Sequence, residues 1–328
     1  MKEIRIGFLG CGGHSYSHLR NLKAIEYVKV VGVFDPKKEN VEKFVKEAGN
    51  VEVYESDANL IKKGNLDGVV INSPHTLHFP QIKLALENGV NVLVEKPAVV
   101  NYKEAQEVKK LLKKTRKVFV VGYQRHYMSN FLGAKKILDE KKLGKLVFVS
   151  GYLAQDWINI VRNTKRVWRF DPKFSGGGQL TDSGSHFVAM LFYLTGLTPT
   201  KVASFIDYRK MKVDINTAFI VNFKEKVIGS FGILGIDPSF REALLIWGEK
   251  GVIKVSGYGE NSYVHYYGKK EPQPIPEVKS EAGSPAADLI ACIRGTKNPQ
   301  TPFEVVEKVA LLSDKIYESF RKRKIAGF

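Results

Sequence analysis

At 328 residues, the chain exceeds the usual size of a single hydrophobic core, so two domains are expected. Hydrophobic residues make up 44% and charged residues 26% of the sequence, which is typical of a globular protein and excludes a disordered chain. The 51 Lys and Arg residues outnumber the 34 Asp and Glu residues and give a net charge of +17, but no nucleic-acid-binding motif accompanies them. We therefore expect no nucleic-acid partner and interpret the excess as a solvated surface, with attraction of an anionic cofactor or substrate as the alternative.

The cysteines and the apolar segments indicate the cellular compartment of the protein. Its two cysteines, Cys11 and Cys292, are far apart and form neither a CxxC pair nor a metal-binding spacing, which indicates a reducing compartment. The first residues lead directly into an expected strand, and the longest apolar run, at residues 187–194, is too short to cross a bilayer. We expect a cytoplasmic protein with no membrane segment.

Short apolar runs alternate with amphipathic segments in the first part of the chain. The expected strands are 4–9, 28–34, 68–71, 90–94 and 118–121, and the expected helices are 17–25, 40–48, 80–88 and 102–114. Strands and helices that alternate at this spacing indicate βαβ units and a parallel sheet. With right-handed crossovers, they predict an α/β fold whose N-terminal domain, residues 1–122, is a doubly wound Rossmann sheet.

The pattern changes after residue 122. A helix at 130–140 and a strand at 146–152 are followed by a loop-rich interval and a helix at 186–194, and residues 257–285 read as strand ends and loops. Five runs of alternating character, 202–209, 218–223, 227–234, 243–248 and 252–255, predict antiparallel strands, and helices at 286–294 and 303–322 close the chain. We expect residues 123–328 to form a second, α+β domain on a mostly antiparallel open sheet.

A glycine-rich turn follows the first expected strand. Gly10, Gly12 and Gly13 would let backbone N–H groups approach a pyrophosphate, while Ser15 takes the place of the third glycine of the dinucleotide-binding motif. Asp35 ends the second strand at the distance expected for the acidic residue that binds the ribose hydroxyls. Together these features predict a dinucleotide site.

The same region bears on which dinucleotide is bound. The carboxylate of Asp35 would repel a 2′-phosphate and therefore favours NAD, although Lys37 and Lys38 leave NADP possible. The strand end that contains Ser73 and His75 lies where a parallel sheet meets its cofactor, so both are candidate cofactor contacts, with ordinary loop roles as the alternative.

Two further segments carry groups that can move a proton. Lys96, within Glu95-Lys96-Pro97, follows the strand at 90–94 and is therefore expected at the carboxyl edge of the sheet, where it could donate a proton or a hydrogen bond. Asp182 and His186 are four residues apart at the expected start of a helix, which would place both side chains on one face. Histidine is a suitable general base at neutral pH, and a neighbouring carboxylate would orient it. A capping Asp and a core His remain the structural alternative.

The motifs, taken in order, resemble the Gfo/Idh/MocA oxidoreductases, named after glucose-fructose oxidoreductase, inositol dehydrogenase and a rhizopine-catabolism protein. The resemblance covers nearly the whole chain. Its motifs are Gly10-Cys11-Gly12-Gly13, Glu95-Lys96-Pro97, Gly122-Tyr123-Gln124-Arg125, Trp168-Arg169, Ser175-Gly176-Gly177-Gly178 and Asp182-x-Gly184-x-His186. It implies a Rossmann domain, a second domain whose open sheet often forms a homodimer or homotetramer, and NAD(P)-dependent oxidation or reduction of a sugar, cyclitol or related polyol.

The resemblance also implies residue roles. Lys96, Asp182 and His186 match the family's catalytic residues, with His186 as the proton-transferring group, and no metal is required. The chain departs from many members at Ala189, where they carry Asp. The candidate cofactor-binding residues are Gly10, Gly12, Gly13, His14, Asp35, Ser73, His75, Glu95, Lys96 and Gln124. The candidate substrate-binding residues are Lys96, Arg125, Trp157, Arg162, Trp168, Arg169, Asp182 and His186, with His126 and Tyr127 as further possible pocket residues; for His126, Tyr127, Trp157, Arg162, Trp168 and Arg169, packing is an equal alternative.

Two other function classes stay open. A glycosidase that uses bound NAD for a transient oxidation would show no net NADH production. A non-catalytic NAD-binding regulator would be expected to lack Lys96 or His186, and this chain has both. The clustered arginines hint at an acidic or phosphorylated sugar as the substrate.

Overall fold

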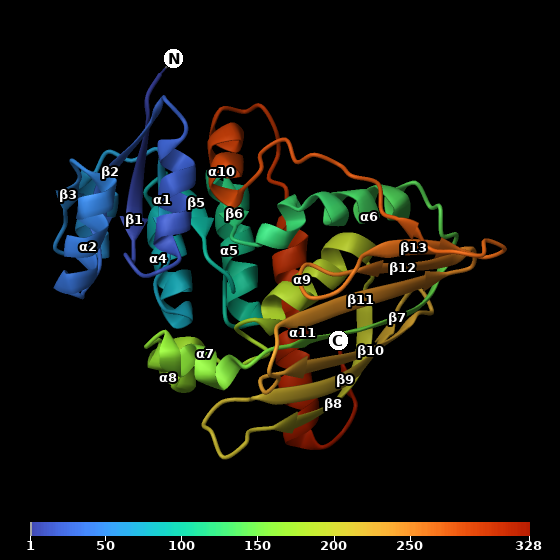
Figure 1. Ribbon diagram of the computed structural model, residues 1–328. Coiled ribbons are helices and arrows are strands. Elements are labelled where there is room, and N and C mark those ends of the chain that lie inside the picture. The colour runs from blue at the N-terminus through green and yellow to red at the C-terminus, as the bar shows by residue number, and fades with distance from the viewer. Residues whose placement is uncertain (1) are drawn as a thin grey trace. The chain divides into compact units, whose positions relative to one another are not determined.

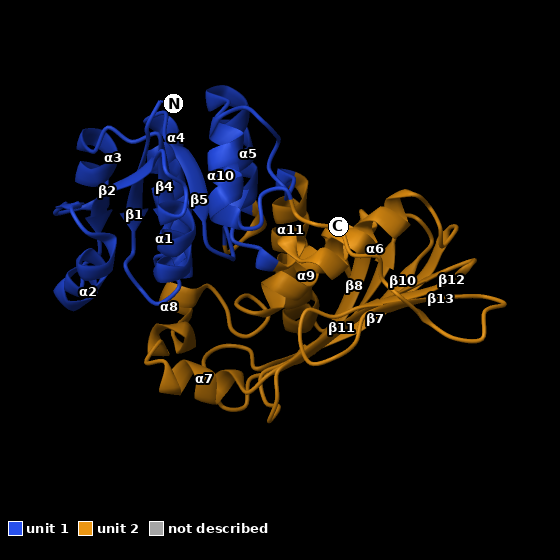
Figure 2. Cartoon of the chain, turned by 45° about the horizontal axis from the view of Figure 1, so that its top comes forward, with its two compact units in different colours: residues 1–99, 103–124, 281–303 blue, residues 100–102, 125–280, 304–328 orange. Residues whose placement is uncertain are grey.

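The computed structural model describes residues 2–328, which form two compact units (Figure 2). Unit 1 comprises Met1–Val99, Lys103–Gln124 and Glu281–Phe303, and unit 2 comprises Val100–Tyr102, Arg125–Ser280 and Glu304–Phe328. The predicted division at 122/123 falls close to the point where the chain leaves unit 1. It differs for residues 281–303, which we assigned to the second domain and which return to unit 1.

Unit 1 is built on a six-stranded parallel sheet with the order β3-β2-β1-β4-β5-β6, which is the Rossmann order (Figure 1). The strands are β1 (Ile4–Leu9), β2 (Val28–Phe34), β3 (Glu52–Val53), β4 (Gly68–Ile71), β5 (Asn91–Val94) and β6 (Phe119–Val121). The helices are α1 (Ser15–Lys23), α2 (Lys38–Ala48), α3 (Asp57–Lys63), α4 (His75–Glu87), α5 (Tyr102–Thr115) and α10 (Pro285–Ile293). The α/β doubly wound prediction is confirmed; the short elements β3 and α3 were not predicted.

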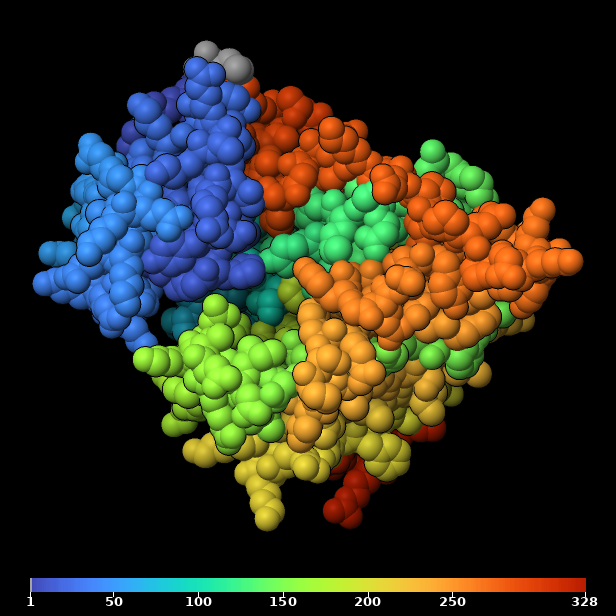
Figure 3. Space-filling view, in the orientation of Figure 1, coloured from blue at the N-terminus to red at the C-terminus, as the bar shows by residue number. Residues whose placement is uncertain are grey.

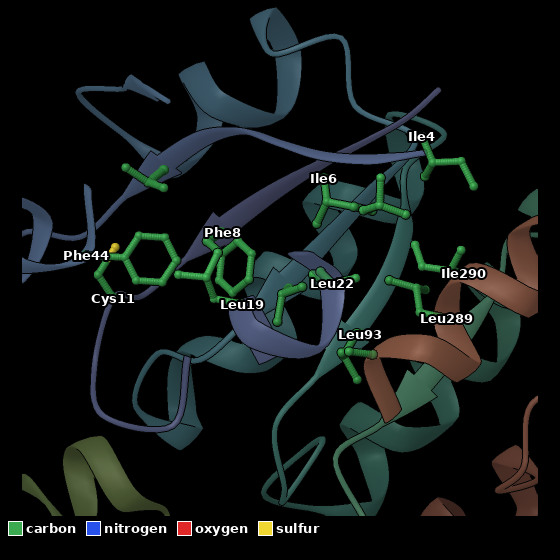
Figure 4. Close-up of a cluster of buried hydrophobic side chains, with 14 of the residues drawn as sticks. Ile4, Ile6, Phe8, Cys11, Leu19, Leu22, Phe44, Leu93, Leu289 and Ile290 are labelled. Atoms are coloured by element: carbon green, nitrogen blue, oxygen red, sulfur yellow. The ribbon is translucent and has the colours of Figure 1, made fainter. Parts of the chain in front are cut away.

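One face of this sheet carries the core that explains why α10 belongs to unit 1. Ile6 and Phe8 of β1, Leu22 of α1 and Leu289 of α10 belong to one cluster of buried apolar side chains (Figure 4). The apolar face of α10, nearly 200 residues away from β5 in the chain, contacts α1, β5 and β6. Burial of apolar surface therefore brings this helix back to the first unit.

Unit 2 contains a nine-stranded, mostly antiparallel sheet with the order β14-β13-β12-β11-β7-β10-β9-β8-β15. Its strands are β7 (Leu146–Ala154), β8 (Pro199–Asp207), β9 (Asn216–Phe223), β10 (Ile228–Leu234), β11 (Arg241–Gly248), β12 (Gly251–Val255), β13 (Tyr263–Tyr266), β14 (Gln273–Pro274) and β15 (Ala326–Gly327). The pair β7 and β10 is parallel, and the other neighbours are antiparallel. The predicted α+β unit on an open sheet is confirmed.

Unit 2 also contains helices, and three of them lie over one face of its sheet. The helices are α6 (Ser129–Asp139), α7 (Trp157–Asn163), α8 (Pro172–Ser175), α9 (Gly184–Thr195) and α11 (Phe303–Lys322), with 3₁₀ helices η1 (Gln124–Tyr127) and η2 (Val167–Phe170). In Figure 1, α6, α9 and α11 lie over one face. The opposite face exposes apolar side chains, and Phe205 of β8 is 80% exposed and Ile220 of β9 is 55% exposed. Within residues 2–328, the helices are too short or too polar to cross a membrane.

Candidate functional site

Three loops of unit 1 meet at one edge of its sheet. The loops begin at Gly10, Asn72 and Glu95, directly after β1, β4 and β5. These strands are parallel and adjacent in the sheet, so their carboxyl ends lie side by side. This is the edge at which open α/β sheets bind their ligands.

The glycine-rich loop has the geometry of a phosphate-binding turn. Gly10 has φ +88°, and a Cβ there would lie 2.8 Å from the backbone of Asn72 and of Ser73, so a larger residue would not fit. A Cβ on Gly12 would meet no atom within 4 Å, which leaves the space above the loop open. Helix α1 follows with no side-chain cap and no acidic residue in its first turn, so its N-terminus suits an anion.

Asp35 is fixed beside this loop. Its Oδ2 accepts a hydrogen bond from the backbone N–H of Cys11 at 2.8 Å and from Nδ2 of Asn40 at 3.1 Å, while Oδ1 accepts from the N–H of Lys37 at 2.8 Å. The carboxylate therefore ties the end of β2 to the glycine-rich loop. It remains partly exposed at the position where an acidic residue binds a ribose.

Asn72 was not predicted as a site residue, although it lies in a strand end that we singled out. Both polar atoms of its side chain are buried and have no hydrogen-bond partner within residues 2–328. Unpaired buried polar atoms are unfavourable in a folded protein unless a ligand or water pairs with them. Together with the open space above Gly12 and the carboxylate of Asp35, this amide shows that the edge fits a dinucleotide.

Ser73 and His75, the two predicted cofactor contacts in the loop after β4, have side chains that are already hydrogen-bonded or buried. Ser73 donates its hydroxyl to Oε1 of Gln81 at 2.7 Å, and the His75 side chain is buried at the first residue of α4. The atoms nearest to a Cβ on Gly10 are backbone atoms of Asn72 and Ser73, not these two side chains.

Glu95 is buried and faces the interior of unit 1. Its Oε1 lies 2.7 Å from Nε2 of His18 and 3.5 Å from Nε2 of His14, which in turn lies 2.7 Å from Nε2 of Gln124. Burial acts to raise the pKa of Glu95. The hydrogen bond with His18 and the nearby His14, His18 and Lys96 have the larger, opposite effect, and the pKa is lowered to about 2. A Cβ on Gly122 would lie 2.5 Å from Glu95 Oε1, so a larger residue there would displace the Glu95 carboxylate. Glu95 therefore anchors the turn that carries Lys96.

The turn at Lys96 is also held from its other side. The ring of buried His78 lies between two carbonyl oxygens, with Nδ1 2.7 Å from the oxygen of Pro97 and Nε2 2.8 Å from the oxygen of Ser73. Burial lowers the pKa of His78, while these two carbonyls and Glu95 act to raise it. His78 thus links the loop after β4 to the turn after β5. Lys96 itself is partly buried, and its peptide bond to Pro97 is cis.

In unit 2, Asp182 is the centre of a second polar group. Its Oδ2 accepts the indole N–H of Trp157 at 2.8 Å and forms an ion pair with Nε of Arg169 at 2.9 Å. Asp182 is 3% exposed and Trp157 is 1% exposed, so this is a buried carboxylate with its charge compensated. The guanidinium of Arg169 also lies over the ring of Trp168, 5.1 Å from its centroid.

The start of α9 differs from the prediction. The helix begins at Gly184, so Asp182 lies in the preceding turn rather than on the helix with His186. The i, i+4 argument is therefore wrong for this pair as stated. The turn is still ordered, because the N–H of Asp182 donates to the carbonyl of Gly178 at 2.9 Å and the N–H of Gly184 to that of Gln179 at 2.8 Å. His186, in the first turn of α9, is partly buried.

The predicted substrate residues of unit 2 fall into two groups. Arg125 is 6% exposed and forms an ion pair with Glu242, in which Nε lies 2.6 Å from Oε1. Its charge is therefore compensated within unit 2. His126 is also buried and stacks on Tyr193 with ring centroids 4.0 Å apart; burial and Arg125 lower its pKa to about 3. Tyr127 is buried as well. For these three, packing is the interpretation that their burial favours.

The second group is closer to Asp182. Trp157 and Arg169 contact it directly, and Trp168 is partly exposed beside Arg169. Arg162, at the end of α7, is exposed. Arg162, Trp168 and Arg169 retain surface that a ligand could reach, whereas Trp157 is buried.

Sequence reasoning missed several residues that hold these loops. Within unit 1 these residues are His18 and His78, and within unit 2 they are Asp214, Tyr317 and Glu242. Their partners lie far away in the chain, by 77 residues for His18 and Glu95 and by 103 for Tyr317 and Asp214. No local motif marks them.

Two family matches cover most of the chain. Residues 4–123 match the oxidoreductase family described as having an NAD-binding Rossmann fold, and residues 131–254 match the GFO/IDH/MocA C-terminal domain. The two matched segments fall on the two sheets described above.

Individual proteins agree with this assignment. Glucose-6-phosphate 3-dehydrogenase of Bacillus subtilis (strain 168) is 28% identical over 58% of this chain and 53% of its own length. The scyllo-inositol 2-dehydrogenase (NAD(+)) of the same strain is 27% identical over 61% of this chain and 56% of its own length. The chain thus covers just over half of the length of each of these two relatives. The WlbA dehydrogenase of Chromobacterium violaceum, solved with NADH and UDP-GlcNAcA, has a TM-score of 0.85 at 20% identity, over 100% of this chain and 96% of that one.

Proposed function

This chain belongs to the GFO/IDH/MocA family of NAD-binding oxidoreductases, and we propose that it is a dehydrogenase of a secondary hydroxyl group on a sugar, cyclitol or related polyol. The observation that carries the proposal is the edge of the unit 1 sheet. There the open turn at Gly12, the carboxylate of Asp35, the unpaired amide of Asn72 and the turn of Lys96 follow adjacent or nearby parallel strands.

The cofactor is proposed to be NAD, held by the glycine-rich loop, the N-terminus of α1 and Asp35. Bound NAD would supply the acceptor for the hydride of the substrate carbon. The carboxylate of Asp35 disfavours the additional phosphate of NADP, because like charges repel. Asn72 would pair its buried amide with the same ligand. Gly13, His14 and Gln124 remain further candidate contacts on this side.

The residues of the chain move the proton. His186 is proposed to accept the hydroxyl proton as the C–H hydride leaves, so that the alcohol becomes a carbonyl compound. Lys96 is proposed to donate a hydrogen bond to the same oxygen, whose negative charge grows as the proton departs. Asp182, held by Trp157 and Arg169, fixes the turn in front of His186. In the reverse direction His186 returns the proton.

The finer proposal is that the substrate carries an anionic group. Unit 2 concentrates basic residues at α7 and η2, a segment at the surface in Figure 3, where it is yellow-green. Arg162 and Lys165 are exposed there, and Arg169 links the segment directly to Asp182. Arginine binds phosphate and carboxylate well because its planar guanidinium donates two parallel hydrogen bonds. A phosphorylated sugar or a sugar acid fits this charge better than a neutral polyol.

The test is NADH formation at 340 nm with NAD or NADP across matched sugars: glucose, glucose 6-phosphate and glucuronate, together with inositols and amino sugars. We expect NAD-dependent turnover and a lower KM for the anionic member of a pair. The variants Lys96→Ala and His186→Ala should each reduce kcat at least about a hundredfold, the usual size of a general acid–base contribution. NAD binding should stay nearly unchanged in both.

Matched controls separate these effects from general damage. Lys113→Ala on the exposed side of α5 and His265→Ala on β13 remove the same chemical groups elsewhere and should retain wild-type turnover. Equal loss of NAD binding and turnover in Lys96→Ala would show that its role is misassigned. Tight NAD binding without turnover on any compound would favour the regulator, and bond cleavage of a glycoside without net NADH would favour the NAD-dependent glycosidase.

The open face of the unit 2 sheet is proposed to bind a second copy of the chain, giving a homodimer or homotetramer. Phe205, Ile220 and Ile228, on the neighbouring strands β8, β9 and β10, are 80%, 55% and 51% exposed. A contiguous apolar face of this kind is unusual on a monomer. The family resemblance names this sheet as the usual contact between copies.

A further inference from the structure

The turn that precedes α9 is hydrogen-bonded to a single residue, Asp214, which lies in the segment before β9. The N–H of Gly178 donates to Asp214 Oδ1 at 2.6 Å, and the N–H of Leu180 donates to Oδ2 at 2.7 Å. Between them, the N–H of Gln179 donates to the backbone carbonyl of Asp214 at 2.9 Å. Three consecutive amides are therefore tied to one residue. Two positions further on lies Asp182.

The close packing around this attachment leaves no room for side chains at Gly177 and Gly178. A Cβ on Gly178 would lie 1.9 Å from the backbone oxygen of Asp214, and a Cβ on Gly177 would lie 2.1 Å from Oγ1 of Thr181 and 2.6 Å from the Tyr317 hydroxyl. These glycines therefore allow close approach of the chain to itself.

Tyr317 completes the attachment from α11. Its hydroxyl donates to Asp214 Oδ1 at 2.5 Å and lies 3.0 Å from Oγ1 of Thr181. Asp214 is 1% exposed, and burial raises its pKa, while the Tyr317 hydroxyl and the amides of Leu180 and Gly178 act to lower it. Burial also raises the pKa of Tyr317 well above its ordinary value, so the phenol stays protonated and can donate.

A buried carboxylate that receives three donors is a rigid support. Its oxygens accept hydrogen bonds from Gly178, Leu180 and Tyr317, so movement of the turn away from Asp214 would break hydrogen bonds to a buried carboxylate. From this turn the chain continues through Asp182 to His186, in the first turn of α9. Small displacements of a catalytic group lower the rate strongly, because proton transfer depends on geometry.

We propose that Asp214 and Tyr317 are positioning residues that hold the 178–182 turn and thereby set the place of Asp182 and His186. The inference rests on the proposed function for its catalytic consequence, but the attachment itself is a property of unit 2. Asp214 is 1% exposed, and both residues are proposed to act through the turn. Their effect should therefore appear in kcat and in the order of the turn, and not in NAD binding.

The test uses Tyr317→Phe, which removes one hydroxyl and keeps the ring, and Asp214→Asn, which replaces one acceptor oxygen by a donor. Tyr208→Phe is the matched control, because Tyr208 lies within electrostatic range of Asp214 and packs on α11 at Phe320, ring centroids 5.9 Å apart, but within residues 2–328 its hydroxyl makes no hydrogen bond to Asp214 or to the turn. We expect Tyr317→Phe to lower kcat about tenfold and Asp214→Asn to lower it more, with the dissociation constant of NAD within twofold of wild type. Tyr208→Phe should retain wild-type kcat.

Amide hydrogen exchange gives a readout that needs no turnover. In the folded variants, exchange at residues 178–182 should become faster in Tyr317→Phe and unchanged in Tyr208→Phe, with the midpoint of thermal unfolding reported beside it. If exchange and kcat both match wild type in Tyr317→Phe, the proposal is overturned. If the wild-type protein oxidises no compound, the proposed function fails, while faster exchange in Tyr317→Phe still supports the attachment and unchanged exchange rejects it.

Discussion

The ion pair between Arg125 and Glu242 gives a prediction that separates packing from substrate binding. The Glu242 side chain is fully buried, the Arg125 side chain is 7% exposed, and Nε lies 2.6 Å from Oε1. The guanidinium also lies over the rings of Tyr258 and Phe240, 5.3 Å and 5.8 Å from their centroids. In Arg125→Met, the buried Glu242 would keep only the N–H of Gly257, at 3.2 Å, to compensate its charge.

Loss of one partner of a buried pair destabilises a protein by about 3–5 kcal/mol, because an uncompensated charge stays in the interior. For a domain of 150–250 residues, each kcal/mol lowers Tm by about 2–4 °C, so Arg125→Met should lower the Tm of unit 2 by about 6–20 °C. Glu242→Leu should have a similar effect.

The double variant Arg125→Met/Glu242→Leu should recover most of this loss, because two apolar side chains of similar size can replace a buried pair. Thermal unfolding followed by circular dichroism, with the KM of the best substrate measured below the transition, checks all three proteins. Our reasoning is refuted if the two single effects add in the double variant. It is also refuted if Arg125→Met keeps its Tm and raises KM while Glu242→Leu does neither, since Arg125 would then bind substrate.

Three more outcomes are expected. Asp35→Ala should raise the dissociation constant of NAD about 10- to 100-fold, the effect of losing a charge-assisted hydrogen bond, and should raise that of NADP less. Binding titrations with both cofactors measure this, and an equal change for both would show that Asp35 does not discriminate between NAD and NADP. Because the folded-state pKa of Glu95 is about 2 and lies below its ordinary 4.5, its contribution to stability is complete above about pH 4.5 and is lost as the pH falls toward 2. Urea unfolding of unit 1 should show this loss in the wild type and much less of it in Glu95→Gln, and identical pH profiles would contradict the ion-pair assignment. Phe205→Glu should convert the proposed oligomer to monomers in light scattering, while Val53→Glu, on an exposed strand of unit 1, should not; an unchanged mass for Phe205→Glu would place any oligomer contact elsewhere.

The local signals in the sequence were sufficient for the fold class of each unit and for the positions of the glycine-rich loop and the Lys96 turn. A glycine is needed where φ is positive and the backbone of Asn72 is close, and Gly10 marked that turn. Alternating apolar residues marked the strands of unit 2, because successive side chains of a strand point to opposite faces. The position of Lys96 followed from its place directly after a parallel strand. These are properties of neighbouring residues, and neighbouring residues are what a sequence displays.

Tertiary structure decided which distant residues hold those loops. The partners of Asp214 and Arg125, Tyr317 and Glu242, are 103 and 117 residues away in the chain. The return of α10 to unit 1 was likewise invisible, because its apolar face shows that it is buried but not against which sheet. Hydrophobic periodicity specifies the face of an element that avoids water, and many partners could satisfy it. The choice among them is made by the packing of the complete chain, which also decides whether a charged residue such as Arg125 meets a substrate or a buried carboxylate.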